Sequence, residues 1–331
     1  MKKTLVILTT HFGTNFSGGS AATCEIFSRL ENQFKEIVVV GTQLGDHSFT
    51  SVRFLKYHNW FHALSILRGL SGLNTLFYGD FYNSLLFIIA GVQFHFTYHD
   101  NWPELGKEGI LNGFRSLFYT NVYKAIFRRA KSVVTVSKFK HDYVKRYASN
   151  PRLIRNGFSR AHSSAGSVPI HKTNSVLMVG NIDRRKYGLA LPLFKKLAQK
   201  GITIDIYGNA VDPKLADQLD EFPFVNIKGY IKSIPYSSYK LLLHTSVSES
   251  FGMVFCEAIF QGIPVLTFDV GGARELISTG NGRLIKPYDI VQMSQVLLDM
   301  LEEKVNVIPG SLKEYSWERA SKSYLDNFQL C

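Results

Sequence analysis

Short apolar runs alternate with amphipathic runs along the first half of the chain. LVILTT, a glycine-bearing loop, the helical run AATCEIFSRLENQF and then EIVVVGT form a strand–loop–helix–strand unit. Further strands are predicted at Thr75–Tyr78, Val92–Tyr98 and Ser132–Val136. Such alternation is typical of a parallel sheet covered by helices, in which right-handed crossovers bring the loops after the strands to one edge. The pattern predicts an α/β fold that binds its ligand at this edge.

The alternation stops in a polar segment and then starts again. Residues Ala148–Asn174 are rich in Ser, Pro and Gly, which is typical of a linker or a crossing between domains. Strand and helix patterns resume with SVLMVG and KYGLALPLFKKLAQKG, and 331 residues are many for one hydrophobic core. We therefore predict two Rossmann-like parallel-sheet domains with a cleft between them, at 1–160 and 161–312. A last helix at about 313–331 is expected to pack back on the first domain.

Composition and local pattern exclude several classes of protein. An apolar content of 45% with 19% charged residues describes a globular chain. The three cysteines, Cys24, Cys256 and Cys331, lie far apart, which indicates a reducing compartment and no disulfide framework. The first apolar run is too short for a signal peptide, and the run Tyr82–Tyr98 divides into a helix to Ala90 and a strand. We expect a cytoplasmic protein without a transmembrane segment.

The net charge of +12 is densest in the segment Arg115–Arg146. This segment holds nine basic residues against the single acidic Asp142, with aromatic residues between them. Such a stretch can attract anionic lipid headgroups or nucleic acid, although a solvated helix face over a core-facing aromatic stripe explains the same pattern. No nucleic-acid-binding module accompanies the charge. The segment therefore favours an anionic membrane surface, such as the inner face of the plasma membrane, over nucleic acid.

The stretch SESFGMVFCEAIFQG places two glutamates around a helix start. Glu249 precedes the predicted helix Met253–Gln261, and Glu257 lies about one turn inside it, among apolar residues. Gly252 allows close backbone approach, and the N–H groups near Gly252–Val254 favour an anion such as a phosphate. Carboxylates also accept hydrogen bonds from paired hydroxyls, as sugars and riboses provide. A helix-terminal charge at Glu249 and a lysine partner for Glu257 explain the stretch equally well.

A second basic cluster follows a strand of the second domain. Arg184, Arg185 and Lys186 come directly after SVLMVG, and we expect them on the loop edge. Three consecutive cations at a strand end can hold a diphosphate, although such a run alone is more often a solvated surface. An anion-binding helix start in the same domain favours a nucleotide diphosphate.

Two features of the first domain lie at strand ends. His99 follows the predicted strand Val92–Tyr98 and is expected to face a ligand, whereas His95 inside that strand is expected to be structural. Gly18 and Gly19 predict a flexible turn after the first strand, where the backbone can approach a phosphate or a substrate. The sequence has no G-x-G-x-x-G, H-E-x-x-H or Walker lysine motif, and no credible metal cluster.

Together these residues resemble the donor-site signature of the retaining family 4 glycosyltransferases, which have the GT-B fold of two Rossmann-like domains. Glu249 and Glu257 form an E-x7-E pair in a block that extends past Gly272. The stretches IRNGF, VTVSKFKHDYV, IYGN, IKGYI and GRLIKPYD fall in the family's order, so the resemblance covers essentially the whole chain. It implies transfer with retention of anomeric configuration, without a metal or a cofactor.

The resemblance also implies a role for each matching position. His99 and Glu249 would be catalytic, with Glu249 touching the transferred sugar, and Glu257 would hold the ribose hydroxyls of a nucleotide diphosphate sugar. Asn181 stands where the family often has an arginine, so Arg184 or Arg185 would replace that charge. The positions implied for donor binding are Gly18, Gly19, Arg184, Arg185, Lys186, Tyr230, Ile231, Ser250, Phe251, Gly252, Met253, Val254 and Glu257.

The expected substrates are a nucleotide sugar, with a UDP-sugar ahead of a GDP-sugar, and a glycan or lipid-linked acceptor in polysaccharide or lipopolysaccharide synthesis. Two other hypotheses stay open: a non-catalytic glycosyltransferase-like binding subunit, and a phosphorylase or epimerase on the same architecture. The presence of Lys186, His99, Glu249 and Glu257 argues against the first.

Overall fold

A computed structural model describes residues 2–72, 74–107, 110–158, 174–303, 307, 312 and 314–329. The chain forms two compact units. Unit 1 comprises Met1–Gly157 and Tyr315–Cys331, and unit 2 comprises Phe158–Glu314. The predicted boundary at 160/161 and the predicted ends of the last helix at 313 and 331 lie outside the described residues.

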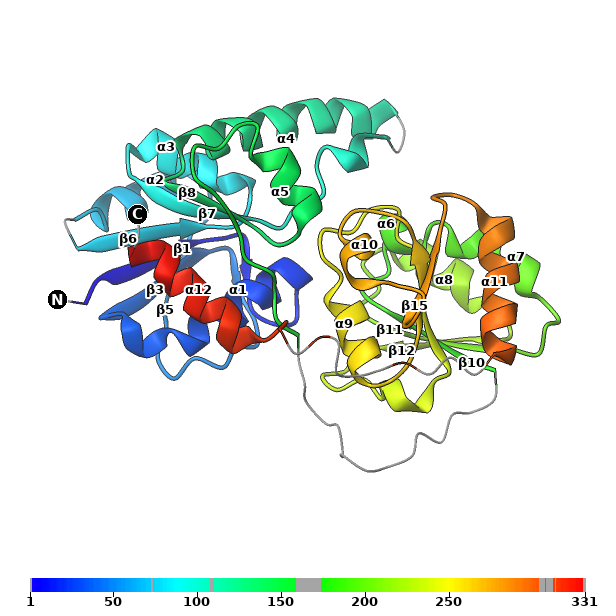
Figure 1. Ribbon diagram of the computed structural model, residues 1–331. Coiled ribbons are helices and arrows are strands. Elements are labelled where there is room, and N and C mark those ends of the chain that lie inside the picture. Colours follow the sequence, from blue (N-terminus) through cyan, green and yellow to red (C-terminus); the bar gives the residue numbers. More distant parts are fainter. Residues whose placement is uncertain are drawn as a thin grey trace. The chain divides into compact units, whose positions relative to one another are not determined.

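Unit 1 is built on a seven-stranded parallel sheet in the order β5-β3-β1-β6-β7-β8-β9 (Figure 1). The strand order changes direction between β1 and β6, which is where parallel α/β sheets bind ligands at their carboxyl edge. The three strands predicted near residues 75, 92 and 132 are confirmed as β6, β7 and β8, with ends shifted by at most two residues. The strands are β1 Thr4–Leu8, β3 Glu36–Gly41, β5 Arg53–Lys56, β6 Thr75–Gly79, β7 Phe94–Tyr98, β8 Ser132–Thr135 and β9 Pro151–Leu153, with β2 His11–Phe12 and β4 Gln43–Leu44 paired separately.

Helices cover both faces of this sheet because alternate side chains of each strand point to opposite faces. Phe94, Phe96 and Tyr98 of β7 join the apolar core under α2, α3 and α4. The intervening His95 and Thr97 face the last helix, α12. The helices of unit 1 are α1 Gly18–Arg29, α2 Trp60–Gly69, α3 Leu85–Ala90, α4 Ile110–Arg129, α5 Lys138–Val144 and α12 Trp317–Gln329, with short 3₁₀ turns η1 Glu31–Gln33, η2 Tyr82–Ser84 and η3 Glu104–Lys107.

The last helix, α12, completes the core of unit 1 although it lies far from the rest of the unit in sequence. It packs against α1. The Tyr324 hydroxyl lies 2.9 Å from Thr97 Oγ1, Asn327 Nδ2 donates to Ser132 Oγ at 2.8 Å, and Ser321 Oγ donates to a backbone carbonyl of α1. Buried polar groups of β7 and β8 therefore find their partners on α12, as buried polar groups require.

Unit 2 has a six-stranded parallel sheet in the order β12-β11-β10-β13-β14-β15 (Figure 1). One sheet face packs on α7, α8 and α11, and α9 contacts β13 and β14. The prediction of two parallel α/β sheets is confirmed. The elements are β10 Ser175–Val179, α6 Arg184–Tyr187, α7 Ala190–Leu197, β11 Thr203–Tyr207, α8 Pro213–Asp220, β12 Val225–Gly229, η4 Tyr236–Ser238, β13 Leu241–His244, α9 Met253–Phe260, β14 Val265–Phe268, α10 Ala273–Leu276, β15 Gly282–Ile285 and α11 Ile290–Glu302.

The apolar run Tyr82–Tyr98 divides as predicted. Helix α3 ends at Ala90, Gly91 takes the left-handed conformation (φ 72°) that commonly follows a helix, and β7 begins three residues later. Among the described residues, no helix combines the length and the apolar character that a membrane crossing needs.

Candidate active site

The loop between β13 and α9 carries Glu249, and glycines shape it. Helix α9 begins at Met253, as predicted, after Gly252 in the left-handed region (φ 95°). A Cβ on Gly252 would lie 2.3 Å from the ring of Phe255, so this position has no room for a side chain. The first N–H groups of α9 therefore open directly onto the Glu249 loop.

A pair of glycines after β14, Gly271 and Gly272, holds the backbone of the same loop. Gly272 N donates to Glu249 O at 3.0 Å. Gly271 is left-handed (φ 52°), and a Cβ there would lie 1.7 Å from Glu249 O. The position of Glu249 thus depends on the absence of a side chain in the neighbouring loop.

We expect Gly271→Ala to lower the free energy of unfolding of unit 2 by about 2 kcal/mol, because alanine adds a left-handed strain and a backbone clash. Gly280→Ala is the matched control, since nothing lies within 4 Å of a Cβ at that glycine. Urea denaturation of both variants measures the difference. Equal stability of the two would show that the Glu249 loop moves aside without cost.

Glu249 is a partly buried carboxylate held between a histidine and two cations. Its Oε2 lies 3.4 Å from His244 Nε2, and its Oε1 accepts a long hydrogen bond from Phe251 N at 3.5 Å. Burial alone would raise the pKa of Glu249, but the hydrogen bond and charge of His244, followed by the charges of Lys186 and Arg185, outweigh it and lower the pKa to about 2. Glu249 is therefore ionised at neutral pH.

His244 is a site residue that the sequence analysis missed. It ends β13 on the sheet face that α9 covers, and its ring packs edge-on against Phe255 at 5.0 Å between centroids. Burial lowers the pKa of His244, while the neighbouring Glu249 opposes this effect. The alternation in the strand LLLH could have placed it beside the helix, but nothing in the sequence connects it with Glu249.

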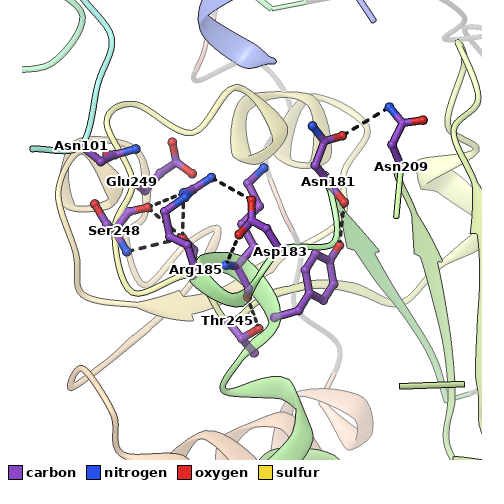
Figure 2. A network of polar contacts seen from close by, with 12 residues as sticks. Asn101, Asn181, Asp183, Arg185, Asn209, Thr245, Ser248 and Glu249 are labelled. Atoms are coloured by element: carbon purple, nitrogen blue, oxygen red, sulfur yellow. Dashed lines mark hydrogen bonds and ion pairs between the residues drawn. The ribbon is translucent and has the colours of Figure 1, made fainter. Parts of the chain in front are cut away.

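The three consecutive cations follow β10 at the loop edge, as predicted, and they form most of the single-turn helix α6, which is capped by Asp183. Successive side chains on a helix turn by about 100°, so the three diverge. Arg184 is two-thirds exposed, and its Nε lies 3.3 Å from Asp212. Arg185 points to the Glu249 loop instead (Figure 2), where Nη1 donates to Ser248 O at 2.9 Å.

Lys186 lies beside the same loop. A Cβ on Gly180 would be 2.4 Å from Lys186 Nζ, so the amine rests against the glycine that follows β10. Desolvation and the charge of Arg185 lower the pKa of Lys186, while Glu249 opposes them. Of the three cations, Arg185 and Lys186 therefore face Glu249, and Arg184 faces α8.

Glu257, one turn inside α9, accepts a hydrogen bond from the Tyr236 hydroxyl at 2.5 Å. Tyr236 is a second residue that the sequence analysis missed. It lies in η4 and is buried, and burial together with Glu257 raises its pKa. No local signal in PYSSY could have indicated a partner 21 residues away. Tyr230 and Ile231 follow β12 at the carboxyl edge of the same sheet, with Tyr230 exposed.

The predicted residues of unit 1 also lie together. The prediction of a flexible turn at Gly18 and Gly19 is wrong. Both glycines belong to the first turn of α1, whose cap Ser17 accepts a hydrogen bond from Ser20 N. A Cβ on Gly19 would lie 3.1 Å from the His99 Cβ, so the glycine allows the close approach of His99. Burial lowers the pKa of His99 to about 4, which makes its ring neutral at pH 7.

No group of three or more His, Cys, Asp and Glu side chains in the described part of the chain is placed to hold a metal ion. The predicted site residues described above form one local group in each unit. Unit 2 brings together the Glu249 loop, the start of α9, Arg185 and Lys186, and unit 1 brings together Gly18, Gly19 and His99.

Comparison with known proteins finds a family match in unit 2. Residues 173–303 match the family model described as Glycosyl transferases group 1. Poly(glycerol-phosphate) alpha-glucosyltransferase of Bacillus subtilis is 32% identical over 138 residues, which are 38% of this chain and 20% of that protein. The GtfA subunit of the Streptococcus gordonii UDP-N-acetylglucosamine–peptide N-acetylglucosaminyltransferase is 26% identical over 133 residues, 38% of this chain and 26% of that protein. The matches thus span 20% and 26% of the length of these two relatives.

Solved structures match the whole chain. HepE of Anabaena, in complex with UDP and glucose, superposes with a TM-score of 0.79 at 17% identity, over 99% of this chain and all of that one. Sucrose-phosphate synthase of Thermosynechococcus elongatus has a TM-score of 0.80 at 17% identity, over 99% of each chain. WaaG, a glycosyltransferase involved in lipopolysaccharide biosynthesis, has a TM-score of 0.72 at 16% identity, over 97% of this chain and 95% of that one. Residues 173–303 therefore match the group 1 glycosyltransferase family, and the chain has the GT-B fold.

Proposed function

We propose that the chain is a retaining family 4 glycosyltransferase. It moves a sugar from a nucleotide diphosphate sugar to a glycan or lipid-linked acceptor, in the synthesis of a cell-surface polysaccharide or lipopolysaccharide. The observation that carries the proposal is the ionised Glu249, held by His244 beside Arg185, Lys186 and the first turn of α9. A fixed negative charge beside two cations and a helix start suits a reaction that separates a sugar from a diphosphate.

The positive groups of unit 2 stabilise the leaving diphosphate. As the bond from the anomeric carbon to the phosphate oxygen breaks, negative charge develops on the diphosphate. Lys186, Arg185 and the N–H groups of Met253 and Val254 provide the cations and the helix dipole that favour it. We include no metal ion in this step, because these groups supply the positive charge that a metal otherwise provides.

Glu249 stabilises the positive charge that develops on the sugar ring at the same time. It does so as a carboxylate beside the reacting centre, and we assign it no covalent bond to the sugar. The acceptor hydroxyl attacks on the face that the diphosphate leaves, so the anomeric configuration is retained. Glu257 holds the ribose hydroxyls through the carboxylate that Tyr236 orients. His99, neutral and beside Gly19, donates a hydrogen bond to the donor sugar.

Two further parts concern the substrates. We favour a UDP-sugar because HepE, which shares the fold, is described in complex with UDP and glucose.

We also propose that an anionic membrane surface lies near the acceptor. The basic segment Arg115–Arg146 does not offer all its charges for this purpose: Lys140 is buried and paired with Glu104 at 2.7 Å, and Lys145 pairs with Asp142.

The test begins with the thermal stability of the chain in the presence of UDP, GDP, ADP and CMP. At a hundredfold excess over its dissociation constant, UDP is expected to raise the melting temperature by roughly 5 °C. UDP-sugars and acceptors then follow, with NMR to assign the anomeric configuration of the product and with EDTA present throughout. Glu257→Ala should remove most of the UDP shift.

Each alternative predicts a different result. A chain that none of the nucleotides stabilises contradicts the proposal as a whole. Binding without hydrolysis or transfer indicates a non-catalytic subunit, turnover that requires inorganic phosphate indicates a phosphorylase, and a changed sugar still attached to its nucleotide indicates an epimerase. Loss of transfer in EDTA overturns the metal-independent mechanism, and an inverted product overturns the assignment to a retaining family.

A further inference from the structure

Helix α4 has apolar side chains on both of its faces. The inner face, which includes Tyr123, Ile126 and Phe127, is buried in the core of unit 1. On the outer face Phe114, Leu117 and Phe118 are 69%, 66% and 59% exposed. Their spacing of three and four residues places these side chains next to one another on the helix. An apolar helix face of this kind is normally buried against another part of the protein, a partner or a membrane.

Three arginines share this outer face with the apolar side chains. At about 100° per residue, Arg115, Arg128 and Arg129 lie within the same arc of about 160° as Phe114 and its apolar neighbours. All three arginines are exposed. We call the face formed by Phe114, Arg115, Leu117, Phe118, Arg128 and Arg129 the outer face of α4.

The helices α2 and α3 also expose apolar side chains and carry no acidic residue. Helix α3 packs against both α2 and α4 (Figure 1). Phe61 of α2 is 85% exposed, and Ile89 of α3 is 49% exposed. The sequences of these three helices contain no Asp or Glu. This layer of unit 1 therefore offers apolar side chains and positive charge without a negative charge of its own.

We propose that the outer face of α4 docks on an anionic phospholipid surface, with its apolar side chains inserted at the headgroup boundary and its arginines on the phosphates. A lipid surface provides both hydrocarbon and negative charge to one exposed helix face. A second copy of the chain provides apolar surface but no negative charge, since it would bring the same arginines and a net charge of +12. The inference rests on the proposed function, because docking would bring the enzyme to a lipid-linked acceptor. The binding itself requires no sugar nucleotide.

Flotation of the full chain with vesicles tests the docking. The vesicles are phosphatidylcholine alone, or with about one-third phosphatidylglycerol, at about 0.05 M and about 0.5 M salt. We expect binding to the anionic vesicles only, weakened by salt. Combined Phe114→Ser, Leu117→Ser and Phe118→Ser should lower the partition coefficient at least about tenfold. Combined Arg115→Glu, Arg128→Glu and Arg129→Glu should lower it about a hundredfold or more and remove the salt dependence.

Matched controls lie on unit 2. Val211→Ser with Val291→Ser removes apolar side chains that are 60% and 64% exposed, and Lys195→Glu, Lys196→Glu and Lys214→Glu reverses exposed charges. Both controls should bind the anionic vesicles within about twofold of the unaltered chain. Equal losses in controls and α4 variants would mean that net charge alone drives binding, and would overturn the proposal.

Other outcomes also decide the proposal. Failure of the unaltered chain to float with anionic vesicles overturns it. A dimer in analytical ultracentrifugation that the serine variant dissociates, without vesicle binding, assigns the face to a second copy instead. The α4 variants should keep the melting-temperature shift with UDP, so a failure of docking remains separate from a failure of the proposed activity.

Discussion

Replacing Glu249 with glutamine is expected to lower the turnover number for glycosyl transfer about a thousandfold, while the affinity for UDP changes by less than about threefold. Glutamine keeps the size of the side chain and can still accept the hydrogen bond from Phe251 N. It removes the negative charge that the structure maintains on Glu249, whose pKa is lowered to about 2. The loss corresponds to about 4 kcal/mol of transition-state stabilisation.

Single-turnover kinetics with a UDP-sugar measures the chemical step, and calorimetry measures UDP binding. Glu221→Gln, at an exposed position of unit 2, is the matched control and should behave as the unaltered chain. If Glu249→Gln turns over within about tenfold of the unaltered chain, the carboxylate has no role in the reaction. An acid limb of the rate profile that titrates near the ordinary pKa of glutamate, and disappears in Glu249→Gln, would contradict the lowered pKa.

Replacing Lys186 with methionine is expected to lower kcat/KM for the donor by about a thousandfold without loss of stability. The amine faces the Glu249 loop and would meet the leaving diphosphate. Desolvation already lowers the pKa of Lys186, so the folded protein gains nothing from holding this charge in place. Methionine fills a similar volume without the cost of desolvating a cation. The melting temperature should therefore stay about unchanged, because this saving offsets the positive charge that Glu249 loses.

Arg184→Met and Arg185→Met complete the series on α6. Arg184 is directed to Asp212, and its replacement should change kcat/KM by less than about threefold. Arg185 donates to Ser248 O beside Glu249, and its replacement should cost about a hundredfold. These variants decide which arginine supplies the charge that Asn181 lacks. A large loss in Arg184→Met with a small loss in Arg185→Met would mean that α6 changes conformation when the donor binds.

Much of the fold could be predicted because its signals are local. Apolar runs such as Ser132–Val136 are long enough to indicate strands. Gly91 and Gly252 mark a helix end and a helix start through their left-handed backbone. The start of α9 after Gly252 followed from the glycine and the apolar run after it.

The parts that could not be predicted depend on contacts between distant residues. Tyr236 meets Glu257 across 21 positions, and the loop that brings Glu249 to His244 is held by Gly272 after β14. Arg184 and Lys186 point in different directions because they lie on one turn of helix, and a run of three cations does not predict such a turn. The outer face of α4 was hidden for a related reason. Aromatic residues on both sides of a helix give no periodic pattern, so the sequence cannot tell a core-facing ring from an exposed one.

The return of α12 to unit 1 has a consequence for biosynthesis. The described helices and strands of unit 2 are complete once α11 has emerged from the ribosome, whereas β7 and β8 still lack the helix that contacts Thr97 and Ser132. Unit 2, although encoded later than most of unit 1, can thus reach its native state first. A chain that ends before Trp317 and has been released from the ribosome should therefore already protect unit 2 from protease, while the sheet of unit 1 is still cleaved.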